Sequence, residues 1–183
     1  MKLHLLHRLA APLCVGLLVS LVHAGHAADA KTPSVGDPAP RVEGKTQDGD
    51  TWKLADSLGK KVVLLYFYPK DDTPGCTTQA CGLRDQMGDL KKGNVEVIGV
   101  SFDSADSHRE FIKKHDLNFT LIADTDGKIA DAFGARMGPD RNMARRVTFL
   151  IGLDGNIKHV TDNRSADVHL TEMKNAVAKL DAK

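Results

Sequence analysis

Two cysteines, Cys76 and Cys81, are the residues of this sequence best suited to covalent chemistry. The segment around them predicts an apolar strand that ends at Pro69, then a polar turn, and then a helix that begins at Pro74. Cys76 would lie in the first turn of that helix, where free N–H groups and the helix dipole favour an anion. Cysteines in such positions have a pKa of roughly 3.5–7.5 instead of ~8.5. The sequence therefore predicts that Cys76 is a thiolate nucleophile.

Cys76 also belongs to the apolar face of its own helix. At 100° per residue it lies within about 40° of four apolar residues, which are Ala80, Leu83, Met87 and Leu90. A sulfur that continues a buried face is expected on the floor of a pocket rather than on open surface.

The spacing of the two cysteines argues against a structural disulfide. Cys81 lies about 140° around the helix from Cys76, and in an intact helix the two Cα atoms are ~8.6 Å apart. A disulfide requires about 4.4–6.8 Å. A redox pair explains the spacing, because peroxide converts a thiolate to a sulfenic acid that a second thiol then converts to a disulfide. We therefore expect the helix to unwind between Cys76 and about Leu83 during the reaction.

Alternating strand and helix patterns surround this segment. Strands are predicted at residues 62–68, 95–102, 119–122, 147–151 and 157–161. Helices are predicted at 75–92, from a Ser107/Glu110 capping box to about 115, before Phe133, and along the stripe Leu170, Met173, Val177 and Leu180.

Two turn signals complete the expected architecture. Asp48-Gly49 and Asp154-Gly155 each predict a β-hairpin. Strands that alternate with helices indicate a sheet with parallel members, which the second hairpin extends and the last helix covers. The expected fold is therefore an α/β, thioredoxin-like sandwich with an N-terminal β-hairpin. The residues between 134 and 145 are expected to form a long loop.

The first 30 residues differ in composition from the rest of the chain. Lys2 and Arg8 precede a mostly apolar stretch at 9–22, and small residues follow up to Ala30. This is the layout of a cleaved signal peptide, and 14 apolar residues are fewer than the ~20 that span a bilayer. We expect residues 1–30 to be removed with Cys14, and residues 31–183 to form one domain that is exported to the periplasm and has no stable membrane association.

Charge and metal-ligand spacing exclude other classes. The 183 residues carry 25 basic and 24 acidic side chains without a basic tract, so nucleic-acid binding is not expected. His108 and His115 are predicted to be surface residues, while His159 and His169 carry no signal of their own. The sequence predicts neither a metal site nor a cofactor.

The segment that carries Cys76 resembles the peroxiredoxins, in particular the Q-type group also called bacterioferritin comigratory proteins. The family pattern of proline, threonine and peroxidatic cysteine stands here as Pro69, Thr73 and Cys76. The resolving cysteine of the Q-type group matches Cys81, and the arginine of the Arg-x-Thr/Ser-Phe pattern matches Arg146. The resemblance extends over about residues 35–180.

The resemblance implies a peroxiredoxin fold and a role for each matched residue. Cys76 would attack a hydroperoxide, Thr73 would hydrogen-bond the peroxide or the thiolate, and Arg146 would hold the thiolate and the leaving oxygen. Pro69 would shield the site, and the N–H groups of Gly75 and Cys76 would complete the oxygen-binding track.

The same resemblance implies the partners of the reaction. They are hydrogen peroxide or a small organic hydroperoxide, and a thioredoxin-like reductant that reopens an intramolecular Cys76–Cys81 disulfide. A monomer or weak dimer suffices, because the resolving thiol is local. The family often has an acidic residue where Arg145 stands and an aspartate where Gly152 stands, so these two positions depart from it.

Two other functions compete with a peroxidase. One is a dithiol–disulfide oxidoreductase for exported proteins, which normally uses a Cys-x-x-Cys motif that this sequence lacks. The other is an exported copper carrier on the same fold, because thiolates suit Cu(I). Such carriers usually space their cysteines by three residues, and they would leave Thr73 and Arg146 without a purpose.

Overall fold

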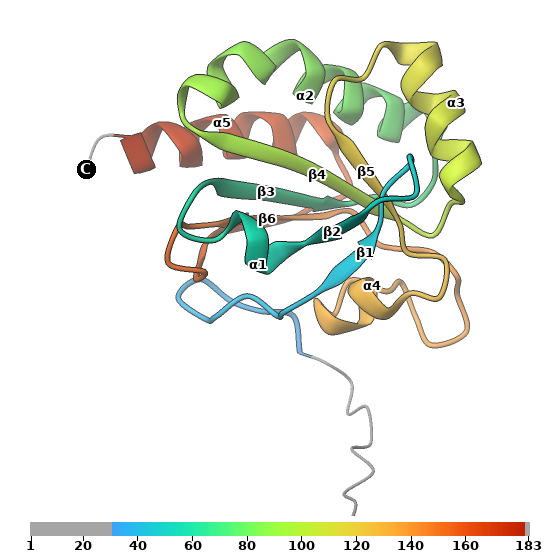
Figure 1. Ribbon diagram of the computed structural model, residues 1–183, viewed down its shortest axis with the longest axis horizontal. Coiled ribbons are helices and arrows are strands. Elements are labelled where there is room, and N and C mark those ends of the chain that lie inside the picture. The colour runs from blue at the N-terminus through green and yellow to red at the C-terminus, as the bar shows by residue number, and fades with distance from the viewer. Residues whose placement is uncertain (1–30, 182–183) are drawn as a thin grey trace, which may run out of the picture.

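The computed structural model describes residues 31–181. The fold is the predicted thioredoxin-like α/β sandwich with an N-terminal hairpin (Figure 1). In chain order the elements are β1 (Glu43–Lys45), β2 (Thr51–Lys53), α1 (Leu54–Ser57), β3 (Val62–Phe67), α2 (Pro74–Lys92), β4 (Val95–Ser101), α3 (Ala105–His115), β5 (Thr120–Ala123), α4 (Lys128–Ala132), β6 (Val147–Ile151), β7 (Ile157–Asp162) and α5 (Ala166–Asp181).

Five of the strands form one mixed sheet in the order β5-β4-β3-β6-β7. The central strand, β3, runs parallel to β4 and antiparallel to β6. β5 continues the parallel half, and β7 pairs with β6 as the predicted second hairpin. β1 and β2 form a separate hairpin around the Asp48-Gly49 turn, where Gly49 has a φ of +86°. The turn that leads to α2 thus begins at the carboxyl end of the central strand.

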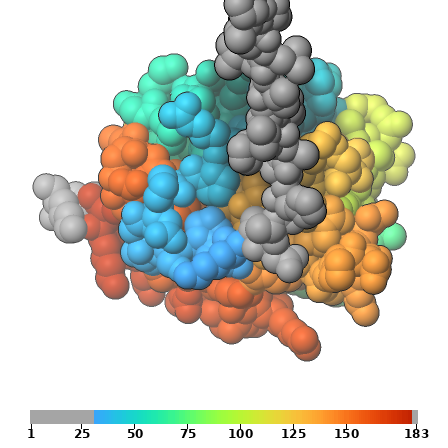
Figure 2. Space-filling model, turned by 90° about the horizontal axis from the view of Figure 1, so that it is seen from below, coloured from blue at the N-terminus to red at the C-terminus, as the bar shows by residue number. Residues whose placement is uncertain are grey.

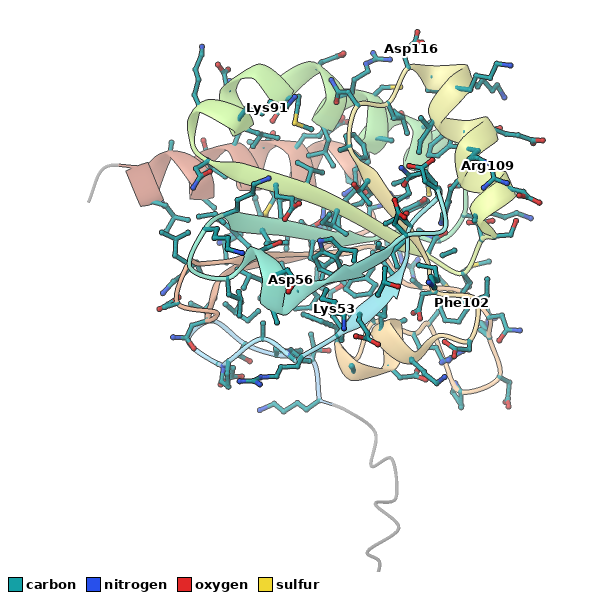
Figure 3. The ribbon with its side chains drawn as sticks, viewed as in Figure 1. Lys53, Asp56, Lys91, Phe102, Arg109 and Asp116 are labelled. Carbon is teal, nitrogen blue, oxygen red and sulfur yellow. The ribbon has the colours of Figure 1, made fainter. Side chains whose placement is uncertain are left out.

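The sheet is covered on both faces, which explains why β3 is apolar throughout. Leu64 and Tyr66 face a cluster that includes residues of α2, α3 and α5, whereas Val63 and Leu65 face a second cluster with residues of α1 and α4. In Figure 1, α2 and α5 lie together on one side of the sheet, and α1 and α4 lie on the other. Charged side chains such as Lys91 and Arg109 lie on the outside of these layers (Figure 3).

Helix α3 corrects two sequence-based predictions. The helix begins after Ser104, whose hydroxyl oxygen accepts a hydrogen bond from the N–H of Ser107 at 3.2 Å, so the predicted Ser107/Glu110 capping box is wrong. His108 is fully buried rather than a surface residue. It lies one turn before Phe111, which is also buried, so the inner face of α3 carries the imidazole into the core.

The segment before β1 is attached to the second hairpin. The N–H groups of Gly36 and Ala39 donate to the carbonyl oxygens of Ile157 and Gly155, both at 2.9 Å. In Figure 2 this segment, in blue, lies against the orange part of the chain that holds the hairpin. The predicted signal peptide and Cys14 lie outside the described residues. Within residues 31–181, no helix has both the length and the hydropathy needed to cross a bilayer.

Candidate active site

The first turn of α2 places Cys76 where the sequence predicts it. Thr73 has extended backbone angles and precedes the helix, and Pro74 occupies its first position. The N–H of Thr77 donates to the carbonyl oxygen of Thr73 at 2.9 Å. The N–H groups of Gly75 and Cys76 come before this bond, so they are free of the helical ladder and point out of its N-terminus. Cys76 is 1% exposed whereas Gly75 is exposed, so the sulfur lies in a buried corner below the open N-terminus of the helix.

Arg146 supplies a positive charge to this corner. It directly precedes β6, and its Nη2 lies 3.3 Å from Sγ of Cys76. A guanidinium N–H has no acceptor function, so this contact stabilises a thiolate more than a neutral thiol. The structure thus brings Arg146 and Cys76 together from segments that are far apart in the chain.

Gly75 allows the guanidinium to approach the helix. A Cβ atom on Gly75 would lie 3.1 Å from Nη2 of Arg146, closer than ordinary van der Waals contact. Any side chain at position 75 would therefore press on the group that contacts the sulfur. Gly75 contributes space to the site in addition to its backbone N–H.

Two further contacts fix the arginine side chain. Nη1 of Arg146 donates to Oε1 of Gln79 at 2.6 Å, and Nε donates to the carbonyl oxygen of Arg164 at 3.2 Å. Gln79 lies one turn after Cys76 on the same face of α2, and it is 1% exposed. Gln79 was not predicted as a site residue, although a polar residue three positions after the cysteine, on the buried face of the helix, was a signal for it.

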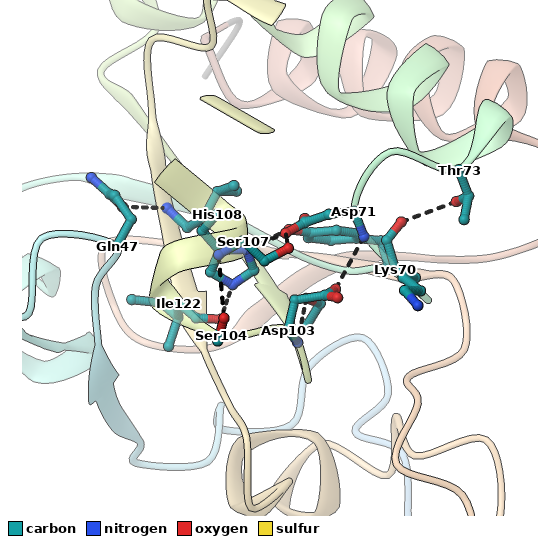
Figure 4. A network of polar contacts seen from close by, with 12 residues as sticks. Gln47, Lys70, Asp71, Thr73, Asp103, Ser104, Ser107, His108 and Ile122 are labelled. Atoms are coloured by element: carbon teal, nitrogen blue, oxygen red, sulfur yellow. Dashed lines mark hydrogen bonds and ion pairs between the residues drawn. The ribbon is translucent and has the colours of Figure 1, made fainter. Parts of the chain in front are cut away.

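The turn between β3 and α2 carries Pro69 and Thr73. The hydroxyl of Thr73 donates to the carbonyl oxygen of Lys70 at 3.0 Å, so its proton is engaged while its oxygen can still accept a hydrogen bond (Figure 4). Pro69 is half-buried and lines a groove together with Arg146. The hydroxyl of Thr73 makes no hydrogen bond to Cys76.

A buried polar cluster connects this turn to the rest of the fold. The carboxylate of Asp71 accepts hydrogen bonds from the hydroxyls of Tyr68 and Ser107, both at 2.7 Å. Nδ1 of His108 lies 2.9 Å from the same carboxylate, and its Nε2 lies 3.2 Å from the carbonyl oxygen of Ile122 (Figure 4). These contacts tie the turn to α3 and β5. These contacts were not predicted, because His108 was expected on the surface.

A groove opens beside the arginine. It has a volume of about 740 Å³ and is lined by residues that include Pro69, Met137, Arg146 and Arg164. Arg145, next to the site, pairs with Asp162 and donates to the carbonyl oxygen of Gly134 at 3.0 Å. The long loop at 134–145 therefore forms one wall of an approach to Arg146.

The structure does not place Cys81 in contact with Cys76. It is half-buried, both cysteines are free thiols, and α2 runs through both positions without interruption. The helical geometry keeps the two Cα atoms ~8.6 Å apart, beyond the reach of a disulfide. Contact between the sulfurs requires the first turns of α2 to change conformation.

Tyr66, which packs in the same core cluster as Cys76, has an unusual hydroxyl. Burial raises the pKa of Tyr66 well above 10, so the phenol stays protonated. Its oxygen is buried and has no hydrogen-bond partner among the described residues.

Comparison with known proteins gives a consistent result. Residues 35–160 match the AhpC/TSA family. The chain is 45% identical over 139 residues to peroxiredoxin Bcp of Escherichia coli K12, an alignment that covers 73% of this chain and 88% of the relative. It is 38% identical over 148 residues to the chloroplastic peroxiredoxin Q of Triticum aestivum, which covers 80% of this chain and 68% of that one.

Solved structures resemble most of the described fold. Peroxidoxin BcpB of Mycobacterium tuberculosis superposes with a TM-score of 0.74 at 29% identity and covers 82% of this chain and 97% of its own. The bacterioferritin comigratory protein of Xanthomonas campestris, described for its alkyl peroxide reduction activity, gives a TM-score of 0.70 at 28% identity, with 78% and 92% covered.

Proposed function

This chain belongs to the AhpC/TSA family and is a Q-type peroxiredoxin, a thiol peroxidase, and from this premise we propose that Cys76 is its peroxidatic residue. The observation that carries the proposal is the contact between the guanidinium of Arg146 and the sulfur of Cys76 at the N-terminus of α2. A buried sulfur that meets a fixed cation and free N–H groups is suited to react as an anion.

In the first step the thiolate of Cys76 attacks the terminal oxygen of a hydroperoxide. The S–O bond forms as the O–O bond breaks, which oxidises the sulfur to a sulfenic acid and releases an alkoxide or hydroxide that takes a proton from solvent. Negative charge moves from the sulfur to the leaving oxygen. Arg146 stays next to both atoms, so it stabilises the transition state without reorganisation.

The neighbouring groups orient the hydroperoxide. The oxygen of Thr73 accepts the O–H of the substrate, because the proton of Thr73 is already donated to Lys70. The N–H groups of Gly75 and Cys76 bind the oxygen under attack, and Pro69 forms the wall that limits access of water. No cofactor or metal takes part in this scheme.

In the second step the thiol of Cys81 attacks the sulfenic sulfur of Cys76. An S–S bond forms, and the sulfenic oxygen leaves as water with the thiol proton. This step requires the first turns of α2 to unwind, because the intact helix holds the two cysteines apart. A thioredoxin-like dithiol then reduces the disulfide, becomes oxidised itself, and returns both cysteines to thiols.

Substrate and assembly follow from the same site. We infer that hydrogen peroxide and small organic hydroperoxides are the substrates, and the groove beside Pro69 and Arg146 has room for an alkyl substituent. Both cysteines lie on one helix, so a monomer or weak dimer completes the cycle without residues from a second chain.

We also infer that the protein acts outside the cytoplasm. The support is the three-part leader of residues 1–30, which has the layout of a cleavable signal peptide. An exported thioredoxin-like protein would then be the electron donor. N-terminal sequencing of the protein from a periplasmic fraction tests this, because an intact Met1 in the mature protein would contradict export by cleavage.

The proposed cycle is tested by turnover and intact mass together. NADPH oxidation is followed with hydrogen peroxide or tert-butyl hydroperoxide, using either thioredoxin with its reductase or glutathione with its reductase as donor. The proposal predicts turnover with thioredoxin and, without a donor, a protein lighter by two hydrogen atoms after one equivalent of peroxide. Turnover that persists in Cys76→Ser, or a disulfide that never forms in the wild type, would refute it.

A further inference from the structure

We propose that His169 is a positioning residue of this peroxidase, which holds Arg146 over Cys76 through Thr148 and Gln79. The inference rests on the proposed function, because it concerns the same sulfur. His169 lies in the first turns of α5, and it carried no signal in the sequence.

A continuous chain of hydrogen bonds joins His169 to the sulfur, and we call it the relay. Nδ1 of His169 lies 2.8 Å from the hydroxyl of Thr148 in β6. That hydroxyl is 3.4 Å from Nε2 of Gln79 in α2. Oε1 of Gln79 accepts from Nη1 of Arg146 at 2.6 Å, and Nη2 of Arg146 reaches Sγ of Cys76 at 3.3 Å.

The donors and acceptors of the relay fit in one direction only. Nε2 of His169 faces the carbonyl oxygen of Asn163 at 2.8 Å, and because a carbonyl only accepts, Nε2 carries the proton. In a neutral ring Nδ1 is then an acceptor, and it takes the hydroxyl proton of Thr148. The oxygen of Thr148 in turn accepts from Gln79, whose carbonyl oxygen is left to accept from Arg146. Each contact between these side chains therefore pairs one donor with one acceptor when His169 is neutral.

The surroundings of His169 favour this neutral form. His169, Thr148 and Gln79 are each 1% exposed. Burial lowers the pKa of His169 below its ordinary value, and the positive charge of Arg146 acts in the same direction. The carbonyl of Asn163 and the carboxylates of Glu172 and Asp162 oppose the shift and do not outweigh it.

The segment that precedes α5 also binds two members of the relay, His169 and Arg146. His169 donates to the carbonyl oxygen of Asn163, and Nε of Arg146 donates to the carbonyl oxygen of Arg164 at 3.2 Å. Neighbouring peptide units therefore hold His169, at one end of the relay, and Arg146, next to its other end. The guanidinium is fixed by Gln79 on one side and by this segment on the other, and His169 fastens the two together.

Protonation of His169 would break this arrangement. A proton on Nδ1 turns it into a second donor that faces Thr148, whose own proton then loses its acceptor. The imidazolium would also bring a second positive charge near Arg146. Arg146 would be held less firmly, so the sulfur of Cys76 would react more slowly at acidic pH, and because the pKa of His169 is lowered this loss begins below the ordinary histidine range.

Three variants in a Cys81→Ser background test the proposal. The first variant is His169→Gln, whose amide can donate to Asn163 and accept from Thr148 but does not titrate. We compare it with His169→Leu, which breaks the relay, and with the control His159→Gln, which removes a half-buried imidazole that lies next to Glu172. The measurements are the single-turnover rate with hydrogen peroxide and the rate of alkylation of Cys76 by iodoacetamide, each from about pH 5 to about pH 8.

We expect His169→Leu to lower the peroxide rate about tenfold near pH 8, where His169 of the wild type is neutral, and the difference should shrink as the pH falls. His169→Gln should match the wild-type peroxide rate near pH 8 within about twofold. As the pH falls, its rate should decline less than the wild-type rate, because no imidazole at position 169 takes up a proton. The control should keep the full wild-type profile. If His169→Leu does not fold, the acid limb of His169→Gln decides alone.

An acid limb that is identical in His169→Gln and the wild type, or a wild-type rate in His169→Leu, would overturn the role of His169. Alkylation reports on the environment of the sulfur even if hydroperoxide is not the substrate. If the wild type consumes no peroxide but the alkylation rates of the variants differ from it in the way expected of the peroxide rates, the proposed function is refuted and the relay is retained.

Discussion

Nη2 of Arg146 lies 3.3 Å from the sulfur of Cys76, although 70 residues separate them in the chain. The sheet makes this contact possible, because β6 pairs with β3 and places its first residues beside the turn that leads into α2. The N-terminus of a helix and an arginine thus converge on one buried sulfur. Both act in the same direction, since each favours the thiolate.

Removal of this cation should impair the reaction far more than removal of a surface arginine. We expect Arg146→Ala to lower the rate constant for hydrogen peroxide by about 10²–10³, the loss typical of a donor that stabilises transition-state charge. Arg109→Ala is the control, because Arg109 lies exposed on α3 (Figure 3). Single-turnover peroxide consumption measures both, and similar rates in the two variants would contradict a role for Arg146.

The close approach at Gly75 gives a second test. Gly75→Ala places a Cβ atom 3.1 Å from Nη2 of Arg146, so the guanidinium must shift and the rate should fall about threefold to tenfold. Gly88→Ala is the matched control in the same helix, because its Cβ would meet nothing within 4 Å. It should keep full activity and stabilise the fold by roughly 0.5–1 kcal/mol. Equal activity of the two variants would show that the space at Gly75 is not needed.

Two buried tyrosines, Tyr66 in β3 and Tyr68 directly after it, should respond differently to loss of their hydroxyls. The hydroxyl of Tyr66 has no partner among the described residues, so Tyr66→Phe should leave the free energy of unfolding unchanged or raise it by about 1 kcal/mol. The hydroxyl of Tyr68 donates to Asp71, so Tyr68→Phe should lower that free energy by about 2 kcal/mol. Urea unfolding measures both, and a larger loss in Tyr66→Phe than in Tyr68→Phe would contradict these assignments.

Disulfide formation should melt the start of α2. Hydrogen–deuterium exchange of the reduced and oxidised forms should show faster exchange between Cys76 and about Leu83 after oxidation, because the backbone bonds of an intact helix are incompatible with the short distance between bonded cysteines. The strands should keep their protection, and they serve as the internal reference. Unchanged exchange in this segment would mean that the disulfide forms without unwinding.

The fold followed from the sequence because hydrophobic periodicity and turn residues act locally. The apolar run at 62–68 predicted the strand that is β3, and the two Asp-Gly pairs predicted both hairpins. The start of α2 was also predictable, since Pro74 suits the first position of a helix. The capping box of α3 was misplaced by one turn, because Ser104 and Ser107 are both capping residues and only the packing selects between them.

The polar groups around the site could not be predicted in the same way. His108 lies on a helix rich in charged residues, so it was expected to be exposed. Its burial depends on a contact with Asp71, which lies 37 positions earlier. His169 depends on Thr148 in another element. Such contacts are set by tertiary structure, and residue type alone carries little information about them. Gln79 is the exception, because helical spacing from Cys76 places it beside the sulfur.

The most direct test of the account is to find which sulfur reacts first with hydrogen peroxide. Reduced Cys81→Ser and Cys76→Ser proteins are treated with one equivalent of peroxide in the presence of dimedone, which traps sulfenic acids, and the adduct is mapped by peptide mass. The account predicts one adduct at Cys76 in Cys81→Ser and none in Cys76→Ser. An adduct at Cys81 that forms as fast in Cys76→Ser would contradict it.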